Sequence, residues 1–487
     1  MLGSQFACSI GSQTLLKREY DFAMEQRISF HGIDLDALRL ALRGLAKQVL
    51  ADAEEWRDSS KLTKSLRGFF VRPNLSLQYR LDASMVHNGQ TVHIEEDEWD
   101  WKGFEALWEE RIKPSAAFLA VRGLLSEDSR AESMLRLFSS RLVVDGLGAS
   151  IAPEIDKYVE ILIRDVKREP QNSHARLWLN GIEVPEEPIT VSDELSFRRP
   201  RPEDLLERVH DDAIHYAHAF QPKTPFSCIA ELQGSESNPG ELQRKAERII
   251  SALRLFRVGS VWGARIDFSI ESFSIFGHGH SVFAPSNNAR ISYALSQTDV
   301  PALLRFLKVV TSEVATPAFT TAEEPNFLST AFAWYSDALL TTGPNEKGIA
   351  AAVACLEALF LSDNPQSEIT YRLVRRVASL LGMCGWPATE IRKQLTDAYD
   401  VRSRYVHGAV PSPKKQLTYD QLFQLFRMTT ETARIALLIM AQLTDWEKRN
   451  HSGMISAIED SFIDDTHRAK LIESCKAIEF GRCLRIT

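Results

Sequence analysis

Near the start of the chain, apolar residues recur at the spacing of an α-helix. Residues 34–57 carry leucines and alanines on one face and charges on the other, after an aspartate that suits the start of a helix. This pattern predicts an amphipathic helix. From about 67 to 95 apolar and polar residues alternate, and the turn residues at 88–90 are typical of a hairpin, which predicts a small sheet. Helical spacing returns over about 103–168.

Strand-like alternation returns in the middle of the chain. At 175–200 it surrounds Gly181 and Pro185, and we expect a strand hairpin there. The charged segment 237–257 has helical spacing instead. Further strands are expected at three places: 226–232, 260–276 and 290–296.

From Pro301 onward the spacing is almost wholly helical, which predicts a helical bundle. Three short segments interrupt this helical pattern: 343–345, 363–365 and 385–387. Each contains residues, chiefly Gly, Pro and Asn, that end helices. The expected helices are 301–315, 326–342, 346–362, 367–383, 387–400 and 417–446. A segment of linker composition near residue 320 marks the start of the bundle.

These patterns predict an α+β protein in three parts. A chain of 487 residues exceeds what one hydrophobic core usually organises. We expect a mixed α/β N-terminal region at 1–170 and a β-rich and helical middle region at 171–319, a candidate sensor or regulatory domain. The helical domain, with a C-terminal helical tail, is expected at 320–487.

Composition narrows the class of protein. Hydrophobic residues at 44% and charged residues at 25% are ordinary for a globular protein, and a net charge of −8 argues against a wholly basic surface for duplex binding. The six cysteines lack C-x-x-C spacing, which favours reduced thiols. Because neither a membrane span nor a signal sequence is evident, we expect a cytoplasmic protein with no membrane contact.

Three clusters offer weaker candidate chemistry. The acidic run at 95–110 is interpreted as a solvated face, with a clamp for a basic peptide as the alternative. The histidines and aspartates at 210–218 are metal-binding types, but their spacing spreads them around a helix, so no metal is expected. Glycines beside the histidines of 277–280 favour a turn. No phosphate-binding loop, dinucleotide fingerprint or serine-hydrolase elbow occurs, and no cofactor is expected.

The most informative segment is YDVRSRYVHG at 399–408. Arg402 supplies a permanent charge and planar donors that suit phosphate oxygens, and His407 is of the residue type that exchanges protons near neutral pH. The segment 366–415 holds nine Lys/Arg and four Asp/Glu, a local reversal of the chain's negative charge. Residues five apart diverge by about 140° around a helix, so the two side chains converge only at a helix end near Gly408 or across a two-fold axis.

The segment resembles the Apea-like branch of HEPN domains, found in prokaryotic antiviral defence proteins. Arg402 and His407 match the family's R-x(4–6)-H signature, and the LEALF sequence within 350–363 resembles its upstream helix. The likeness covers about 320–460. Ala409 stands where a related toxin branch has tyrosine. The resemblance also assigns supporting or RNA-binding residues, of which the last two look like a buried polar pair: Ser403, Arg404, Tyr399, Arg376 and Glu357.

The resemblance implies a metal-independent endoribonuclease, in which the RNA 2′-hydroxyl attacks its neighbouring phosphate. His407 would exchange the protons and Arg402 would stabilise the charge of the transition state. It further implies a homodimer through the HEPN domain, and a toxin or abortive-infection effector whose N-terminal region senses a phage or cellular trigger. One non-catalytic alternative is structural: Arg402 caps or pairs inside the bundle, with Asp400 or Glu357, and His407 is a core or helix-end histidine. A second alternative is a HEPN module that binds RNA or nucleotides, or dimerises, without cleaving RNA.

Overall fold

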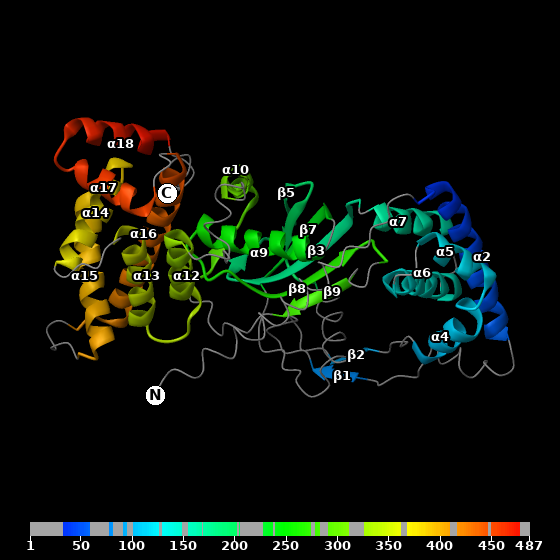
Figure 1. Cartoon of the computed structure of the whole chain (residues 1–487). Helices are drawn as coiled ribbons and strands as arrows, with labels where there is room; N and C mark the ends of the chain where they lie inside the picture. Colours follow the sequence, from blue (N-terminus) through cyan, green and yellow to red (C-terminus); the bar gives the residue numbers. More distant parts are fainter. Residues whose placement is uncertain are drawn as a thin grey trace. The chain divides into compact units, whose positions relative to one another are not determined.

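The computed structural model is a mixed α/β protein in which helices dominate (Figure 1). It describes the following residues: 33–58, 77–80, 91–94, 101–125, 129–148, 154–167, 169–201, 204, 227–236, 239–273, 278–282, 291–310, 326–361, 368–409, 416–446 and 450–477. Two compact units emerge. The first holds Met1–Leu77, His93–Gln171 and Glu271–Gly277, and the second holds Gln78–Val92, Asn172–Ile270 and His278–Thr487. None of the helices described is long and apolar enough to cross a membrane.

The first unit is built around the amphipathic helix α2 (Leu35–Asp58), as predicted. Asp34 begins it, because its Oδ1 accepts hydrogen bonds from the backbone N–H groups of Asp36 and Ala37, at 3.0 and 3.1 Å. The apolar face of α2 is fully buried against the other helices of the unit. These are α4 (Trp101–Leu107), η1 (Trp108–Ile112), α5 (Ala116–Leu125), α6 (Ser129–Gly148) and α7 (Ile155–Lys167).

A buried carboxylate ties α7 to a distant segment of the first unit. Asp165 accepts hydrogen bonds from the backbone N–H of Phe273 at 2.7 Å and from Nε2 of Gln171 at 3.1 Å. Burial raises the pKa of the Asp165 carboxyl to about 6, although these hydrogen bonds oppose the shift. Ionisation of Asp165 at neutral pH therefore reduces the stability of the folded state.

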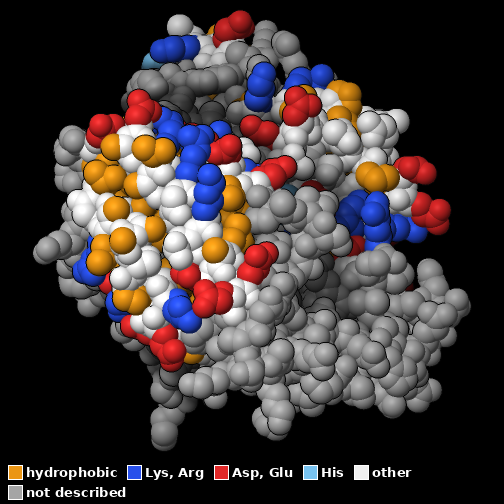
Figure 2. Space-filling model, turned by 90° about the vertical axis from the view of Figure 1, so that its right-hand side faces the viewer, with side chains coloured by type: hydrophobic (Ala, Val, Ile, Leu, Met, Phe, Trp, Pro, Cys, Tyr) orange, Lys and Arg blue, Asp and Glu red, His pale blue; other side chains and the backbone are white. Residues whose placement is uncertain are grey.

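Figure 2 views the molecule from the side on which α2 and α5 are drawn in Figure 1. Acidic and basic side chains are interspersed over the described part of this face, with hydrophobic side chains between them. Leu40 and Leu119 of this unit are 73% and 54% exposed. Such mixed charge gives no continuous positive field for a nucleic acid on the described part of this face.

A six-stranded sheet organises the first part of the second unit, in the order β5-β6-β7-β3-β8-β9. Its strands are β3 (Gln171–Asn180), β5 (Ile189–Ser192), β6 (Leu195–Arg198), β7 (Cys228–Glu236), β8 (Trp262–Ile270) and β9 (His278–Val282). Helices α9 (Pro239–Phe256) and α10 (Val300–Val310) share one apolar core with the sheet (Figure 1). The strands expected at 226–232 and 260–276 and the helix at 237–257 are confirmed.

The middle of the chain departs from the sequence predictions at two places. The hairpin expected at 175–200 forms only in its second half, as β5–β6, whereas β3 pairs antiparallel with the distant β8. The short β4 (Ile182–Glu183) pairs in parallel with β10 (Tyr293–Ala294), which lies within the strand expected at 290–296. The turn expected at 277–280 is also wrong, since His278 and His280 belong to β9 and pair with Ser269 and Asp267 of β8. Backbone pairing with β8 outweighs the turn preference of the glycines.

The described residues from 326 to 477 form a helical bundle within the same unit. Its helices are α12 (Phe327–Leu340), α13 (Asn345–Phe360), α14 (Ile369–Met383), α15 (Ala388–His407), α16 (Tyr419–Trp446), α17 (His451–Asp460) and α18 (Asp465–Ala477). Helix α13 packs against α12, α15 and α16, and α17 and α18 lie at one end of the bundle (Figure 1). The predicted helices are confirmed, and α15 continues past the expected end at 400 to His407.

A buried arginine joins the bundle to α9. Arg434 of α16 donates hydrogen bonds to the carbonyl oxygens of Leu255 and Phe256, at 2.7 and 3.1 Å. Burial opposes its charge, but the Glu431 carboxylate more than offsets this and raises the pKa of Arg434. The Tyr335 hydroxyl donates to the Arg254 carbonyl at 2.8 Å. The last carbonyls of α9, which its own helix leaves unpaired, are thus satisfied by the bundle.

The residue-320 boundary and the cluster at 210–218 lie outside the described residues. So does the turn expected at 88–90, although its flanking strands β1 (Leu77–Arg80) and β2 (Thr91–Ile94) pair in a two-stranded sheet. The three-part division of the chain stays a prediction.

Candidate functional site

Helix α15 presents the predicted motif at the surface of the bundle. Its apolar face is anchored by Leu395, Ala398 and Val401, which are at most 3% exposed. Arg402 follows directly, is partly buried and faces α13. The helix continues without a break through His407, so the two motif residues keep their helical spacing.

Arg402 forms an ion pair with Glu357 of α13. Its Nη2 donates to Glu357 Oε2 at 3.0 Å, and the side chains are 25% and 18% exposed. The guanidinium also lies over the ring of Tyr399, 5.5 Å from the centroid. Burial raises the pKa of the Glu357 carboxyl, and the positive charge of Arg402 offsets this only in part.

His407 stands at the exposed end of α15. Gly408 follows in the left-handed conformation with φ of 66°, which a glycine adopts without steric cost. The N–H of Ala409 donates to the Arg404 carbonyl at 2.9 Å, and that of Gly408 to the Tyr405 carbonyl at 3.4 Å. This is the Schellman arrangement that ends many helices. It leaves His407 exposed at a sharply defined helix end.

Within one chain, the structure does not bring Arg402 and His407 together. On a regular helix they point about 140° apart. Arg402 turns into the bundle toward Glu357, as the non-catalytic alternative anticipated, and His407 turns to solvent. Ser403 and Arg404 are partly buried between them.

The expected polar pair of Glu357 and Arg376 is wrong. Arg376 is 2% exposed and donates through Nε to Glu459 of α17 at 3.0 Å, and also to the Phe360 carbonyl. Glu357 is held by Arg402 instead. The sequence gives no spacing signal for Glu459, because it lies 83 residues after Arg376.

Other cations of the basic segment surround the bundle rather than one cleft. Arg392 and Lys393 are exposed on α15. Arg375 of α14 lies over the Phe462 ring at 4.3 Å. Lys414 and Lys415 lie outside the described residues. The positive charge of this segment is therefore distributed over at least two helices.

The thiols and carboxylates of the described residues do not form a second candidate catalytic or metal site. Cys228, Cys355 and Cys384 are free thiols. Burial raises the pKa of Cys228 to about 12, which makes it a poor nucleophile. In the described part of the chain, no group of three or more His, Cys, Asp or Glu could hold a metal ion. Comparisons of the chain with protein-family models, with curated proteins and with solved structures found no match.

Proposed function

We propose that the chain is a metal-independent HEPN endoribonuclease that acts as a homodimer. The observation that supports this proposal best is the end of α15, where an exposed His407 follows Arg402 at a well-defined helix end. A general acid or base needs access to its substrate, which an exposed histidine has. Arg402 uses Nη2 for Glu357, and Nε and Nη1 have no acceptor among the described residues.

The proposed reaction needs no external reactant beyond RNA. The 2′-hydroxyl loses its proton, its oxygen bonds to the adjacent phosphorus, and the bond from phosphorus to the 5′-oxygen breaks. The leaving oxygen takes up a proton, so the products carry a cyclic phosphate and a 5′-hydroxyl. His407 exchanges these protons, and Arg402 stabilises the added negative charge, with Tyr399, Ser403 and Arg404 in support.

A second copy of the chain supplies the convergence that one helix lacks. A two-fold axis near the end of α15 would set both copies of the motif in one cleft. Tyr405 and Val406, between the two motif residues, are 43% and 56% exposed. Apolar groups left in water at this point suit burial against an identical helix.

A cytoplasmic effector of defence or toxicity would degrade the cell's own RNA if it were always active, so its ribonuclease activity must be inhibited until it is needed. We propose that the remainder of the chain senses a phage or cellular trigger. This part of the proposal rests on the resemblance stated above.

A second candidate function is a HEPN module that binds RNA without cleaving it. The Arg402–Glu357 ion pair favours it, because that contact already gives Arg402 a structural partner. In this case both motif residues contribute to binding or to fold, and no bond is broken.

The deciding experiment incubates the full-length protein with RNA in chelator, beside a DNA strand of the same sequence. Wild type should cut only RNA and leave cyclic phosphate ends. His407→Ala should reduce the rate by about 10²–10⁴-fold. Arg402→Lys should recover little, because lysine lacks the planar fork.

Matched variants separate catalysis from general effects. His467 is an exposed histidine of α18 and Arg392 an exposed arginine of α15, so His467→Ala and Arg392→Lys should cut at the wild-type rate. RNA that is shifted on a gel but never cut would select the binding module. Equal cutting of DNA would refute the mechanism.

A further inference from the structure

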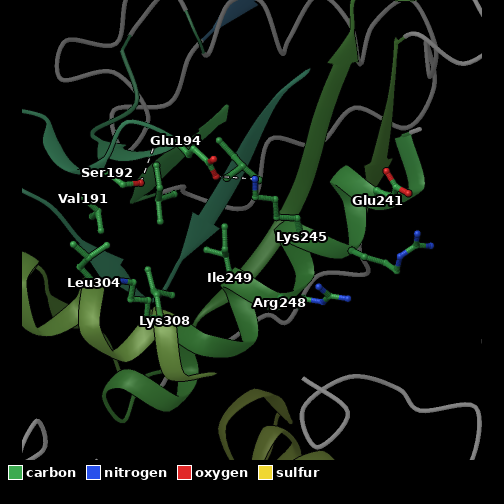
Figure 3. Close-up of a pocket in the computed structure, with 13 residues that line it drawn as sticks. Val191, Ser192, Glu194, Glu241, Lys245, Arg248, Ile249, Leu304 and Lys308 are labelled. Carbon is green, nitrogen blue, oxygen red and sulfur yellow. Dashed lines mark hydrogen bonds and ion pairs between the residues drawn. The ribbon is translucent and has the colours of Figure 1, made fainter. Parts of the chain in front are cut away.

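A cavity of about 530 Å³ lies between the sheet and its two covering helices, far in sequence from the α15 motif (Figure 3). Its walls come from β5, the β5–β6 turn, β6, β7, α9 and α10. This volume lies in the usual range for small-molecule sites, roughly 300–1,000 Å³. The cavity opens to solvent on one side, so a ligand can enter without a rearrangement of the core.

Basic side chains dominate the charge of this cavity. Of thirteen lining residues, four are basic and two are acidic. Arg244 and Arg248 are four residues apart on α9 and so lie on the same face of that helix. Lys308 comes from α10. Figure 3 shows Arg248 on one side of the lining residues and Lys308 on the other side. In a chain of net charge −8 this is a local positive site.

Three of these cations are not neutralised by the protein. The carboxylate of Glu194 pairs with Lys245, whose Nζ lies 2.9 Å away (Figure 3). Arg244, Arg248 and Lys308, in contrast, have no ion-pair partner within the part of the chain that the structure describes. The Nε of Arg248 is moreover buried and finds no acceptor among the described residues.

The rest of the cavity is apolar. Ile249 of α9 lies in the middle of the lining residues, and Leu304 of α10 lies beside Val191 of β5 at one edge (Figure 3). Leu304 is 41% exposed although it lines a cavity. An inorganic anion would use the cations but leave this apolar surface in water.

We propose that this cavity binds a small organic phosphate with an apolar or aromatic body. Its phosphate groups contact Arg244 and Arg248, which share one face of α9, and its body packs on Ile249 and Leu304. A phosphate group carries about −1.5 to −2 charges at pH 7, so it matches these two uncompensated cations better than a single carboxylate does. The proposal is independent of the ribonuclease proposal, because it involves none of the α15 residues.

Titration calorimetry on the full chain tests the proposal with three metal-free probes: ADP, pyrophosphate and glucose 6-phosphate. ADP should bind most tightly, because only it offers both phosphates and an aromatic body. Arg244→Ala and Arg248→Ala should each weaken ADP binding by about tenfold or more, as loss of a charged hydrogen bond does. Leu304→Ser should weaken ADP binding but leave pyrophosphate binding unchanged.

Arg305→Ala is the matched control, because Arg305 is exposed on α10 beside Leu304 but does not line the cavity. It should bind ADP as wild type does. Thermal melting of each variant shows whether it is folded. The proposal is overturned if folded wild-type protein binds none of the probes, if ADP and pyrophosphate bind equally, or if Arg248→Ala binds ADP as tightly as Arg305→Ala.

Discussion

The Arg402 guanidinium occupies a position that serves two purposes at the residue scale. One nitrogen holds the Glu357 carboxylate, which fixes the side chain against α13. A guanidinium has five N–H donors, so one such contact leaves capacity for phosphate oxygens. Glu357 therefore orients Arg402, and in the proposed ribonuclease it also competes with the RNA phosphates for this side chain.

Substitution of Glu357 by glutamine separates these two effects. Glutamine keeps an acceptor for Arg402 but removes the negative charge, so RNA should bind roughly fivefold more tightly at low salt, which corresponds to about 1 kcal/mol. Fluorescence anisotropy with a labelled RNA measures this. Glu459→Gln is the control, because it removes the same charge from the Arg376 pair on α17 and should leave RNA affinity unchanged. Weaker binding by Glu357→Gln would contradict the idea that the two anions compete.

A second residue-scale prediction concerns pH. Because burial raises the pKa of the Asp165 carboxyl to about 6, the folded chain retains a proton that the unfolded chain releases near pH 4. The stability from this proton is complete below the unfolded pKa and is lost as the pH rises through about 6. Between about pH 4 and pH 8, wild type should therefore lose up to about 3 kcal/mol relative to Asp165→Asn.

Urea unfolding of both proteins across this pH range measures the difference. Asp156→Asn on the same helix is the control, since Asp156 is 77% exposed and pairs with Arg43 at the surface. Its difference from wild type should vary little with pH. A flat profile for Asp165→Asn would show that the carboxyl titrates normally.

At this scale the motif of Arg402 and His407 stays a prediction, and the sequence misassigned the partner of Arg376. A motif reports residues close together in the chain. The partner of Arg376 depends instead on where α17 packs, which no local pattern encodes. The cations of the α9 cavity were not recognised for the same reason, because Arg244 and Lys308 line one cavity only in the folded chain.

At the scale of elements, helices were predicted well because their apolar periodicity is local. The 175–200 hairpin was correct only for β5–β6, because strand pairing is not local: Trp178 of β3 faces Arg265 of β8, 87 residues later. Helix α15 was predicted too short, since Val401 is its last buried residue and the apolar residues of its final turn, Tyr405 and Val406, do not continue the buried face. The glycine at 408 was the better end signal.

That glycine gives an element-scale prediction. An alanine at 408 meets no atom within 4 Å, so the cost of Gly408→Ala is the strain of its φ of 66°, about 1 kcal/mol or more. The melting temperature should fall, and RNA cleavage should fall with it because the end of α15 positions His407. Gly44→Ala in α2 also meets no atom within 4 Å, but its backbone is helical, so it should raise stability. Equal effects of the two substitutions would contradict this account.

For the whole molecule, the central prediction is the dimer. Sedimentation should show a dimer at micromolar concentration, and Val406→Glu should weaken it at least about tenfold by placing a charge in the apolar contact. Cleavage should be lost in parallel, while each chain stays folded because Val406 is 56% exposed in the single chain and contributes nothing to its core. Ile463→Glu alters a residue that is 89% exposed in the same unit and should leave the dimer intact. An active monomer would rule out the two-fold site.

The buried Arg434 also limits how this chain can be divided or recombined. Its guanidinium is complete only when α9 supplies two carbonyl oxygens, so the bundle is not a cassette that could be moved whole to another sensor. A graft that begins near residue 320 would keep the Glu431 partner of Arg434 but lose both carbonyl acceptors, which costs about 1 kcal/mol or more. Any exchange of parts between relatives that keeps the bundle intact must therefore carry α9 along with it, so sheet and bundle are expected to have been inherited as one piece.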